Sequence, residues 1–473
     1  MIKKLVSHSF IYGIGPQIPK FAGLLIYPII SQDLTPRDFG LYGIVIAYAQ
    51  AFLYLKTLGT EVVLSNSFFK HPNTYRLYWR HINGMLHVWA FLLSIFLAGI
   101  ILVALKDDPY GTEVAVLNAL PLFLFSTTEN LFFRYYQLQQ KPVPITVRVV
   151  VTGLINIVLT FVTIHTLKLG YRGWFYASFG ASLVGFLWMI YPLYIKVNFT
   201  PILSLRWKFL KRTLSISLPV LPHFYGNYLL GTSDRVVMDV INVEAQEIGR
   251  YNAANIFSNY AMIVATATRK AVGPMLQLLY SRNEWNKAKL LVFYWQIAFL
   301  AGTTFLCIWL KEIVPFFIRT KGIGELHGMA IWIVMAVNYI PMYGGANSQL
   351  YFMERTKELW KRAFVAFAVN IVLNLTLIPI YGVYVAAINT FVAYMFLGYS
   401  SYFLPVYRQK KKMQLYPWMW LSLTLACTLL SLVVGELSWI YKTAVSLALV
   451  GVLLFFVLRF FHIMRAKTRK PTW

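Results

Sequence analysis

The sequence has little cysteine and few acidic residues. Its 473 positions include two cysteines, Cys307 and Cys427, both in apolar stretches with no CxxC motif or histidine nearby. This pattern argues against a disulfide framework and against a cysteine metal site. Nucleotide-binding loops, HExxH, GxSxG and acidic pairs with metal-ligand spacing are missing too. We therefore expect no enzyme, no cofactor and no metal.

Charged residues make up 13% of the chain and hydrophobic residues 58%. Apolar runs of roughly 20 residues, long enough to cross a bilayer, recur with short polar gaps and leave no stretch for a soluble domain. No signal-peptide cleavage site follows Lys3 and Lys4, so we expect a retained first helix. The sequence predicts an all-α polytopic membrane protein of about 14 transmembrane helices. The expected spans are 9–31, 40–58, 83–105, 113–138, 144–167, 171–195, 213–240, 248–275, 289–310, 327–352, 363–380, 381–405, 416–434 and 437–461.

The charges are distributed unevenly between the two ends of these spans. Lys and Arg total 43 against 17 Asp and Glu, and most of the basic residues fall on the side that carries the N-terminus. Since basic residues near helix ends stay in the cytoplasm, both termini are predicted to be cytoplasmic. The net charge of +26 then reflects orientation and lipid headgroups, and nucleic acid is not an expected partner. Acidic residues gather in the opposite, outer loops, where we expect them to be solvated. The few basic residues of the outer side are Arg37, Lys106, Lys168, Arg172, Arg250, Lys311, Arg319, Lys321 and Lys442.

An internal repeat organises the chain. Pro16 and Pro19 form a PxxP near the first helix, and Pro219 and Pro222 form another near the seventh. Each is followed by an outer turn of acid, apolar residue, glycine, any residue and tyrosine, at residues 38–42 and 247–251. Six helices separate the copies, so both enter the membrane in the same direction and a pseudo-two-fold axis along the membrane normal relates them. We expect six-helix lobes at 1–205 and 206–412 and two extra helices with a basic tail at 413–473, with the prolines as hinges.

These segments resemble a known family. Residues 19–28 (PKFAGLLIYP) and 34–42 (LTPRDFGLY) resemble the start of Wzx-type polysaccharide flippases, and residues 217–223 (SLPVLPH), 233–235 (SDR) and 248–251 (IGRY) agree. These flippases belong to the multidrug/oligosaccharidyl-lipid/polysaccharide exporter superfamily. The resemblance implies a flippase that moves undecaprenyl-diphosphate-linked oligosaccharide, such as an O-antigen or capsule unit, from the inner to the outer leaflet of the bacterial cytoplasmic membrane. It also implies alternating access, a role for the last two helices in accommodating the lipid tail, and a polysaccharide polymerase and glycosyltransferases as possible partners.

Four basic residues within or beside spans are the candidate substrate ligands. An ionisable side chain inside a bilayer is costly unless it is paired or hydrated, so each suggests a site. Lys20 follows the first PxxP, where a cavity-facing ammonium could attract the diphosphate; the alternative is pairing with a carboxylate. Lys56, Arg269 and Lys270 lie near inner helix ends, where snorkelling to headgroups is the simpler interpretation. As a group they resemble the cationic cavity of lipid II flippases.

A second set of residues is predicted to couple ions or to stabilise the fold. Asp234 and Arg235 are helix neighbours that point in different directions, so each needs its own partner. Asp234 is either a fold-stabilising acceptor or a proton or sodium site. Glu129 and Arg134 are five residues apart and do not share a helix face, so packing against a neighbouring helix is expected. His223 could titrate near neutral pH, although a hydrogen-bonded packing role is the simpler expectation.

Two other functions remain open at this point. A multidrug and toxin exporter coupled to protons or sodium should have a mainly acidic cavity for cationic drugs, whereas the residues within spans are mainly basic. A membrane polysaccharide polymerase or ligase should carry one large outer loop with catalytic Arg or His, whereas the outer loops are short. The sequence does not identify the glycan, the coupling ion or the oligomeric state.

Overall fold

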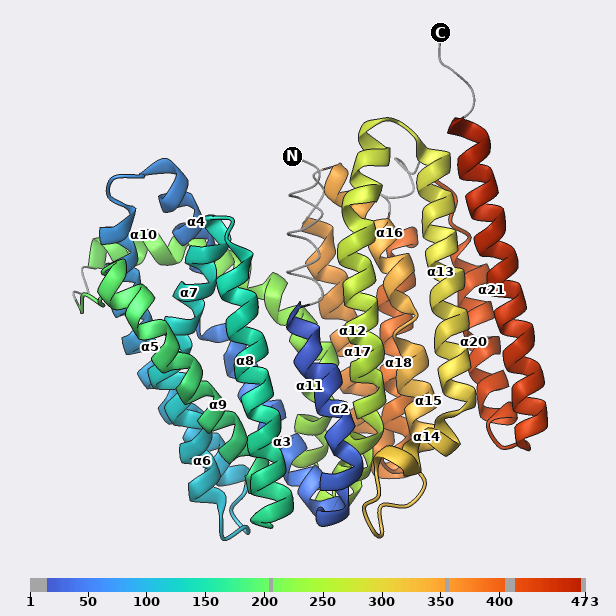
Figure 1. Cartoon of the computed structure of the whole chain (residues 1–473), viewed down its shortest axis with the longest axis horizontal. Helices are drawn as coiled ribbons and strands as arrows, with labels where there is room; N and C mark the ends of the chain where they lie inside the picture. The colour runs from blue at the N-terminus through green and yellow to red at the C-terminus, as the bar shows by residue number, and fades with distance from the viewer. Residues whose placement is uncertain (1–14, 204–206, 354–356, 405–412, 469–473) are drawn as a thin grey trace. The chain divides into compact units, whose positions relative to one another are not determined.

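The structure is a computed structural model that describes residues 15–203, 207–353, 357–404 and 413–468. All regular secondary structure in this part of the chain is helical (Figure 1). Within the described residues, each of the expected spans overlaps one helix or several helical elements in succession, which confirms the predicted all-α polytopic fold. Eight of the described helical segments are long and apolar enough to cross a membrane.

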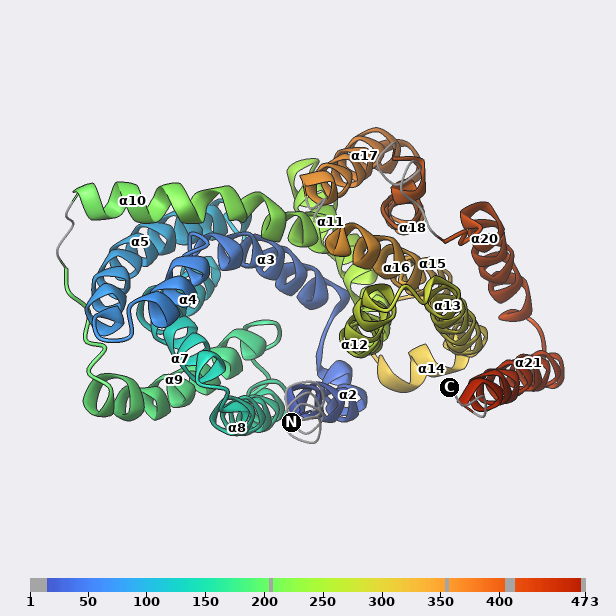
Figure 2. The ribbon, with the colours of Figure 1, turned by 90° about the horizontal axis from the view of Figure 1, so that it is seen from above.

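Two compact units make up the chain, and the first consists of Met1–Asn252 with Phe317–Ile323. Its α2 packs on α8, α3 on α5 and α11, and α8 on α9; Figure 2 shows these helices end-on. The described elements of this unit are η1 (Gly15–Gln17), α2 (Ile18–Ile30), η2 (Ser31–Asp33), α3 (Pro36–Leu55), α4 (Glu61–Lys70), α5 (Tyr75–Ala104), α6 (Gly111–Leu120), η3 (Pro121–Phe125), α7 (Ser126–Leu138), α8 (Pro142–Thr160), η4 (Phe161–Thr166), α9 (Arg172–Ile190), η5 (Tyr191–Lys196), α10 (Trp207–Ser217), η6 (Leu218–Val220) and α11 (Leu221–Val240).

The second unit consists of Ala253–Phe316 and Gly324–Trp473. The helix α12 (Ala245–Ser281) begins in the first unit and continues into the second. Helix α18 packs on α15, α16 and α17, while α20 and α21 both pack on α13. The predicted boundaries at 205 and 412 stay a prediction. The remaining elements are α13 (Trp285–Ile308), α14 (Leu310–Phe317), α15 (His327–Ala336), α16 (Tyr339–Phe352), α17 (Lys357–Tyr381), α18 (Tyr384–Tyr399), η7 (Ser400–Phe403), α20 (Pro417–Val434) and α21 (Trp439–Thr468).

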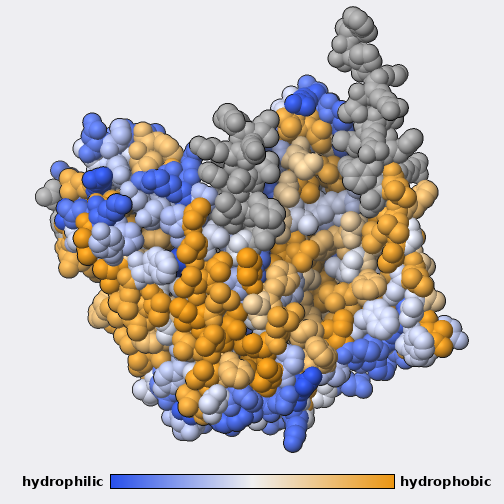
Figure 3. Space-filling view, in the orientation of Figure 1, coloured by the Kyte–Doolittle hydropathy of each residue, from blue (hydrophilic) through white to orange (hydrophobic). Residues whose placement is uncertain are grey.

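The surface of the first unit is that of a membrane-spanning bundle. Hydrophobic side chains cover the middle of its helices, and hydrophilic ones gather at their two ends (Figure 3, left side of the view). On α5, for example, Ile95, Phe96 and Val103 are exposed although they are apolar. Exposed apolar side chains on a long apolar helix face lipid. We call the helix ends that the Lys and Arg distribution predicts to lie outside the cytoplasm the outer ends.

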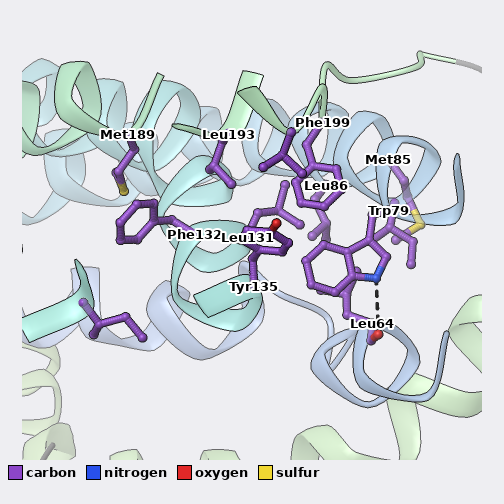
Figure 4. Packing of buried hydrophobic residues seen from close by; sticks show 13 residues of the cluster. Leu64, Trp79, Met85, Leu86, Leu131, Phe132, Tyr135, Met189, Leu193 and Phe199 are labelled. Atoms are coloured by element: carbon purple, nitrogen blue, oxygen red, sulfur yellow. Dashed lines mark hydrogen bonds between the residues drawn. The ribbon is translucent and has the colours of Figure 1, made fainter. Parts of the chain in front are cut away.

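An aromatic core fixes the inner ends of α4, α5, α7 and η5. Trp79 is fully buried, and its indole Nε1 donates to the carbonyl of Leu64 at 3.2 Å and to the hydroxyl of Ser67 at 3.1 Å (Figure 4). Phe199 stacks on the indole with ring centroids 5.1 Å apart, and Tyr135 meets Phe199 edge to face. A buried tryptophan needs such a partner for its N–H. The short α4, which sequence analysis did not predict, is held by this core.

Both PxxP motifs begin helices. Pro16 lies in the 3₁₀ turn η1 and Pro19 in the first turn of α2; Pro219 lies in the 3₁₀ turn η6, and the backbone of Pro222 lies in the first turn of α11. Proline is tolerated there because the first amides of a helix have no acceptor within it. The two copies of the repeat thus share one local structure. The predicted hinge role of the prolines stays a prediction.

Ion pairs tie the C-terminal helices to the outer end of α14. Glu436, in the turn between α20 and α21, accepts from Lys311 Nζ and from His327 Nε2, each at 2.5 Å. The buried Lys442 of α21 donates to Glu312 of α14 at 2.5 Å. Hydrogen bonds from Lys311 and His327 hold the pKa of Glu436 below its ordinary 4.5. Sequence analysis expected outer acids such as Glu312 to be solvated; Glu312 and Glu436 are about half exposed and also serve as partners for basic side chains.

The lowered pKa of Glu436 predicts a pH-dependent contribution to stability. A carboxylate whose pKa is lower in the folded state stabilises the fold above its unfolded pKa and loses that effect as the pH falls through the folded value. We expect Glu436→Gln to lower the thermal unfolding temperature of the purified protein at pH 7. The difference from the unchanged protein should vanish at pH values well below 4.5.

Thermal unfolding by intrinsic fluorescence at several pH values measures this effect. Glu244→Gln is the control, because Glu244 is an exposed acid of the first unit. If Glu436→Gln lowered the unfolding temperature by the same amount at pH 7 and at low pH, the ion-pair explanation would be contradicted.

Candidate functional site

The first unit contains a cluster of three charged side chains inside its bundle. Arg148 of α8 donates from Nη1 to Glu129 Oε1 of α7 at 2.6 Å, and Lys56 Nζ, at the end of α3, lies 4.0 Å from Glu129 Oε2. The side chains of Arg148, Lys56 and Glu129 are 9%, 14% and 32% exposed. One carboxylate thus faces two cations, and the cluster has a net positive charge.

A cavity of about 190 Å³ adjoins this cluster. Its polar wall consists of the three charged side chains with Asn118, Ser126 and Ser182. The π-helical segment η3, between α6 and α7, forms part of its other wall. Such π segments widen a helix and are frequent at functional sites. The cavity can hold water or a small polar group beside the charges.

Arg148 is the member of this cluster that sequence analysis missed. The distribution of Lys and Arg counts it among the basic residues of the inner side, although it falls inside the expected span 144–167. Its position four residues inside a predicted span was the available signal. Helix α9 admits the guanidinium because Gly185 lies beside it: a Cβ at Gly185 would stand 2.9 Å from Arg148 Nη2. The guanidinium carbon also lies over the ring of Phe133, 5.2 Å from its centroid.

The other predicted ligands lie on separate helices. Lys20 is exposed in the first turn of α2, in the first unit. Arg269 and Lys270 are exposed on α12, in the second unit, and the stem of Arg269 runs beside Gly344 of α16. Arg134 hydrogen-bonds Gln137 at 3.2 Å and does not share the Glu129 cluster. The His223 side chain lies outside the described part of the structure, and so does that of Pro222.

Asp234 and Arg235 are buried in α11 and have different partners. Asp234 Oδ2 accepts from the hydroxyl of Tyr251 at 2.6 Å, whereas Arg235 Nε donates to Asn252 Oδ1 at 2.9 Å. Asn252 in turn donates to the carbonyl of Phe39 at 3.1 Å. These bonds connect α11, α12 and α3. The buried acid and base are therefore part of a structural network, and an ion-coupling role for Asp234 stays a prediction.

The two copies of the repeated outer turn contact each other within the first unit. A Cβ on Gly40 would stand 1.8 Å from the carbonyl oxygen of Ala245, and a Cβ on Gly249 would stand 1.8 Å from that of Pro36. The same offset in sequence relates Gly40 to Gly249 and Pro36 to Ala245. The contact is thus reciprocal, as it must be around a two-fold axis. We call this contact, between the first turns of α3 and α12, the glycine crossing.

The comparisons with known proteins agree with this architecture. A structure of the lipid II flippase MurJ in an inward closed conformation is similar at a TM-score of 0.70 and 13% identity, and the match covers 96% of this chain and 99% of that chain. An inward-facing MATE transporter of the MOP superfamily matches at a TM-score of 0.59 and 15% identity, and the match covers 86% of this chain and 96% of that chain. A MOP superfamily transporter from Pyrococcus furiosus matches at a TM-score of 0.58 and 14% identity, and the match covers 85% of this chain and 94% of that chain. The fold is therefore that of MOP superfamily transporters.

The sequence comparison identifies the family. The profile of the polysaccharide biosynthesis protein family matches residues 5–279, more than half of the chain. A search of curated protein sequences gave no match. The chain belongs to the polysaccharide biosynthesis protein family. This confirms the family-level resemblance seen in the repeated motifs, which lie within the matched region.

The glycine crossing predicts a strong effect of small side chains. We expect Gly40→Ala and Gly249→Ala each to destabilise the protein by about 1–3 kcal/mol, because a methyl group cannot enter a contact with a rigid carbonyl. Gly302→Ala in α13 is the matched control, since a Cβ there meets nothing within 4 Å.

Thermal unfolding of the purified variants measures the difference. If either variant were as stable as Gly302→Ala, the two backbones at the glycine crossing could not be in close contact.

The charged cluster predicts an asymmetric response to neutralisation. Glu129→Gln leaves Lys56 and Arg148 without their shared carboxylate, and we expect a loss of about 3 kcal/mol, at the low end for a broken buried pair because Glu129 is partly exposed. Arg148→Gln leaves Glu129 with only the more distant Lys56 of the two cations, and we expect it to lower the free energy of unfolding by a similar amount. The double variant should cost less than the sum of the two single variants.

Unfolding free energies of the four proteins complete the double-mutant cycle. Arg134→Gln serves as the control, because Arg134 does not contact Glu129. Additive losses in the cycle would contradict a direct interaction between Glu129 and Arg148.

Proposed function

We propose that this protein is a flippase that moves a lipid-linked oligosaccharide, carried on undecaprenyl diphosphate, across the bacterial cytoplasmic membrane. The observation that carries the proposal is the match to the polysaccharide biosynthesis family on a chain with the fold of MOP superfamily transporters. A polytopic chain of this kind contributes to polysaccharide synthesis most directly by moving an intermediate across the bilayer. Both termini are then cytoplasmic, as the charge distribution predicts.

Basic side chains on separate elements supply the affinity for the substrate. Lys20 and Lys56 belong to the first unit, and Arg269 and Lys270 to the second. Ammonium and guanidinium groups bind diphosphate oxygens through charge-assisted hydrogen bonds. In an alternating-access cycle, each of these basic residues is a candidate to bind the diphosphate on the inner side. The sugar then crosses within the transporter while the polyprenyl tail stays in lipid.

The glycine crossing keeps the outer ends of α3 and α12 together. Close backbone contact over one helical turn prevents a bulky glycan from passing between them. Outward release requires these two turns to separate, and the lack of side chains at Gly40 and Gly249 allows them to meet again without rearranging any side chain. The hydrogen bonds of Asp234 and Arg235 remain within α11 and α12 during this step, so they preserve the local fold.

Other transport and enzyme functions have less support. MATE transporters share the fold, which keeps a proton-coupled or sodium-coupled drug exporter as the alternative. The net positive charge of the Lys56, Glu129 and Arg148 cluster favours an anionic substrate over cationic drugs. A polysaccharide polymerase or ligase would need a catalytic outer loop. Partnership with polymerase and glycosyltransferases belongs to the proposal and follows from the pathway that a flippase serves.

Replacement of Lys20 tests the proposal in cells. In a strain whose surface polysaccharide depends on this protein, we expect Lys20→Ala to reduce that polysaccharide by roughly tenfold, and Lys20→Glu to abolish it. One lost charge-assisted hydrogen bond to phosphate accounts for the first effect. Lys20→Arg should retain most of the function because it keeps the charge.

Lys321→Ala is the matched control, because it removes an exposed lysine from an outer loop. Immunoblotting of membranes must show equal protein levels for all variants. Normal polysaccharide in Lys20→Glu cells at normal protein level would remove Lys20 from the mechanism. Loss of ethidium export together with unchanged surface polysaccharide in a deletion strain would favour the drug exporter instead.

A further inference from the structure

A groove of about 700 Å³ lies at the outer ends of α3, α5 and α11 in the first unit, well away from the charged cluster. Helix α3 contributes one face of its first three turns, through Arg37, Leu41, Ile44 and Tyr48. The end of α5, the loop after it and the turn between α11 and α12 form the other walls. The volume is within the usual range of sites for small ligands. The family relationship and the proposed transport cycle assign no role to this groove.

The polar part of the groove carries both signs of charge. Arg37 and Lys106 supply two cations, whereas Asp107, Asp108 and Asp239 supply three carboxylates. A net negative lining disfavours a diphosphate, whose two phosphates need excess positive charge. It suits a ligand that carries one phosphate and one ammonium group.

Two of the three carboxylates have fixed positions. Asp239 Oδ2 accepts from the hydroxyl of Tyr48 at 2.7 Å, which orients the carboxylate and leaves Oδ1 for an occupant. Asp108 Oδ1 accepts from the hydroxyl of Tyr171 at 2.6 Å, and its Oδ2 lies 3.6 Å from Arg37 Nη2. The long distance between Arg37 and Asp108 leaves donors of the guanidinium available to a further acceptor.

The apolar part of the groove opens toward lipid. Leu41 and Ile44 are buried beneath the polar groups, while Val103 and Val240 are 74% and 64% exposed. Since α5 spans the membrane, the exposed Val103 near its end, with Val240 at the end of α11, marks the boundary between acyl chains and headgroups. An occupant therefore needs a charged end at the interface and an apolar end below it.

We propose that this groove binds one phospholipid of the outer leaflet whose headgroup joins a phosphate to a primary ammonium, the phosphatidylethanolamine class. Arg37 and Lys106 hold the phosphate, and Asp239 accepts from the ammonium. The acyl chains leave along Val103 and Val240. Because Arg37 and Leu41 flank Gly40, and Ala245 lines the groove as well, the bound lipid contacts both sides of the glycine crossing and stabilises it.

Lipid retention by the purified full-length protein tests the assignment. Native mass spectrometry after exchange into phosphatidylethanolamine, phosphatidylcholine or phosphatidylglycerol with identical acyl chains reports which headgroup stays bound. We expect about tenfold weaker retention of phosphatidylcholine, whose methylated ammonium has no N–H to donate, and weak retention of phosphatidylglycerol, which has no ammonium. Equal retention of the three lipids would overturn the proposal.

Asp239→Asn should remove the preference for phosphatidylethanolamine, while an oxygen remains for the Tyr48 hydroxyl. Glu244→Gln is the matched control, since Glu244 is an exposed acid of the same turn that does not line the groove. If Asp239→Asn fails to fold, Lys106→Gln at an exposed position decides: it should weaken retention of phosphatidylethanolamine and phosphatidylcholine alike. An unchanged headgroup preference in folded Asp239→Asn, or unchanged retention of both lipids in Lys106→Gln, would overturn the assignment. Displacement of the lipid by a soluble oligosaccharide would assign the groove to a glycan and overturn it too.

Discussion

The glycine crossing is the constraint on which the polar interior of the first unit depends. Gly40 and Gly249 let the backbones of α3 and α12 approach until each would-be Cβ overlaps a carbonyl of the other helix. At this separation the Asn252 amide reaches the carbonyl of Phe39, and Arg235 reaches Asn252. Larger residues at the two glycines would break this chain of hydrogen bonds, and the buried Arg235 guanidinium would lose its bond to Asn252 while keeping the one to the carbonyl of Gly231 in its own helix. The loss of a partner for a buried charge is expensive in a membrane protein.

In the charged cluster of Lys56, Glu129 and Arg148, ion pairing offsets the free-energy cost of burying charged side chains. Arg148 is the most deeply buried of the three, and it has the short bond to the single carboxylate. Lys56 stands at the longer distance of 4.0 Å. Since Glu129 can fully neutralise only one cation, the cluster keeps a net positive charge. Two cations around one acid are therefore stabilised by pairing and, in the proposed function, would still attract an anionic substrate.

Sequence reasoning predicted the membrane-spanning helices and the repeat, because both produce patterns that extend over many residues of the sequence. Apolar runs mark the helices from 15 to 461, and Gly40 and Gly249 mark equivalent turns. It did not predict α4 or α14, and its span 213–240 includes only the end of α10. These helices are short, and α4 is held by tertiary contacts to Trp79. It also placed Arg148 at the headgroups, because a basic residue near the start of a span resembles a snorkelling one. Only the position of Glu129 on a neighbouring helix distinguishes the two, and one sequence cannot supply that contact.

The pairing of charges differs between the two sides of the membrane that the charge distribution predicts. On the outer side, acids neutralise basic residues: Arg37 with Asp108, Lys168 with Asp33, Arg172 with Glu113, Arg250 with Glu247, Lys311 with Glu436 and Lys442 with Glu312. Basic residues outnumber acids on the inner side. For the proposed flippase, this excess of positive charge would favour binding of a diphosphate on the inner side, whereas the carboxylates that pair with basic residues on the outer side would favour its release there, without any change in the substrate itself.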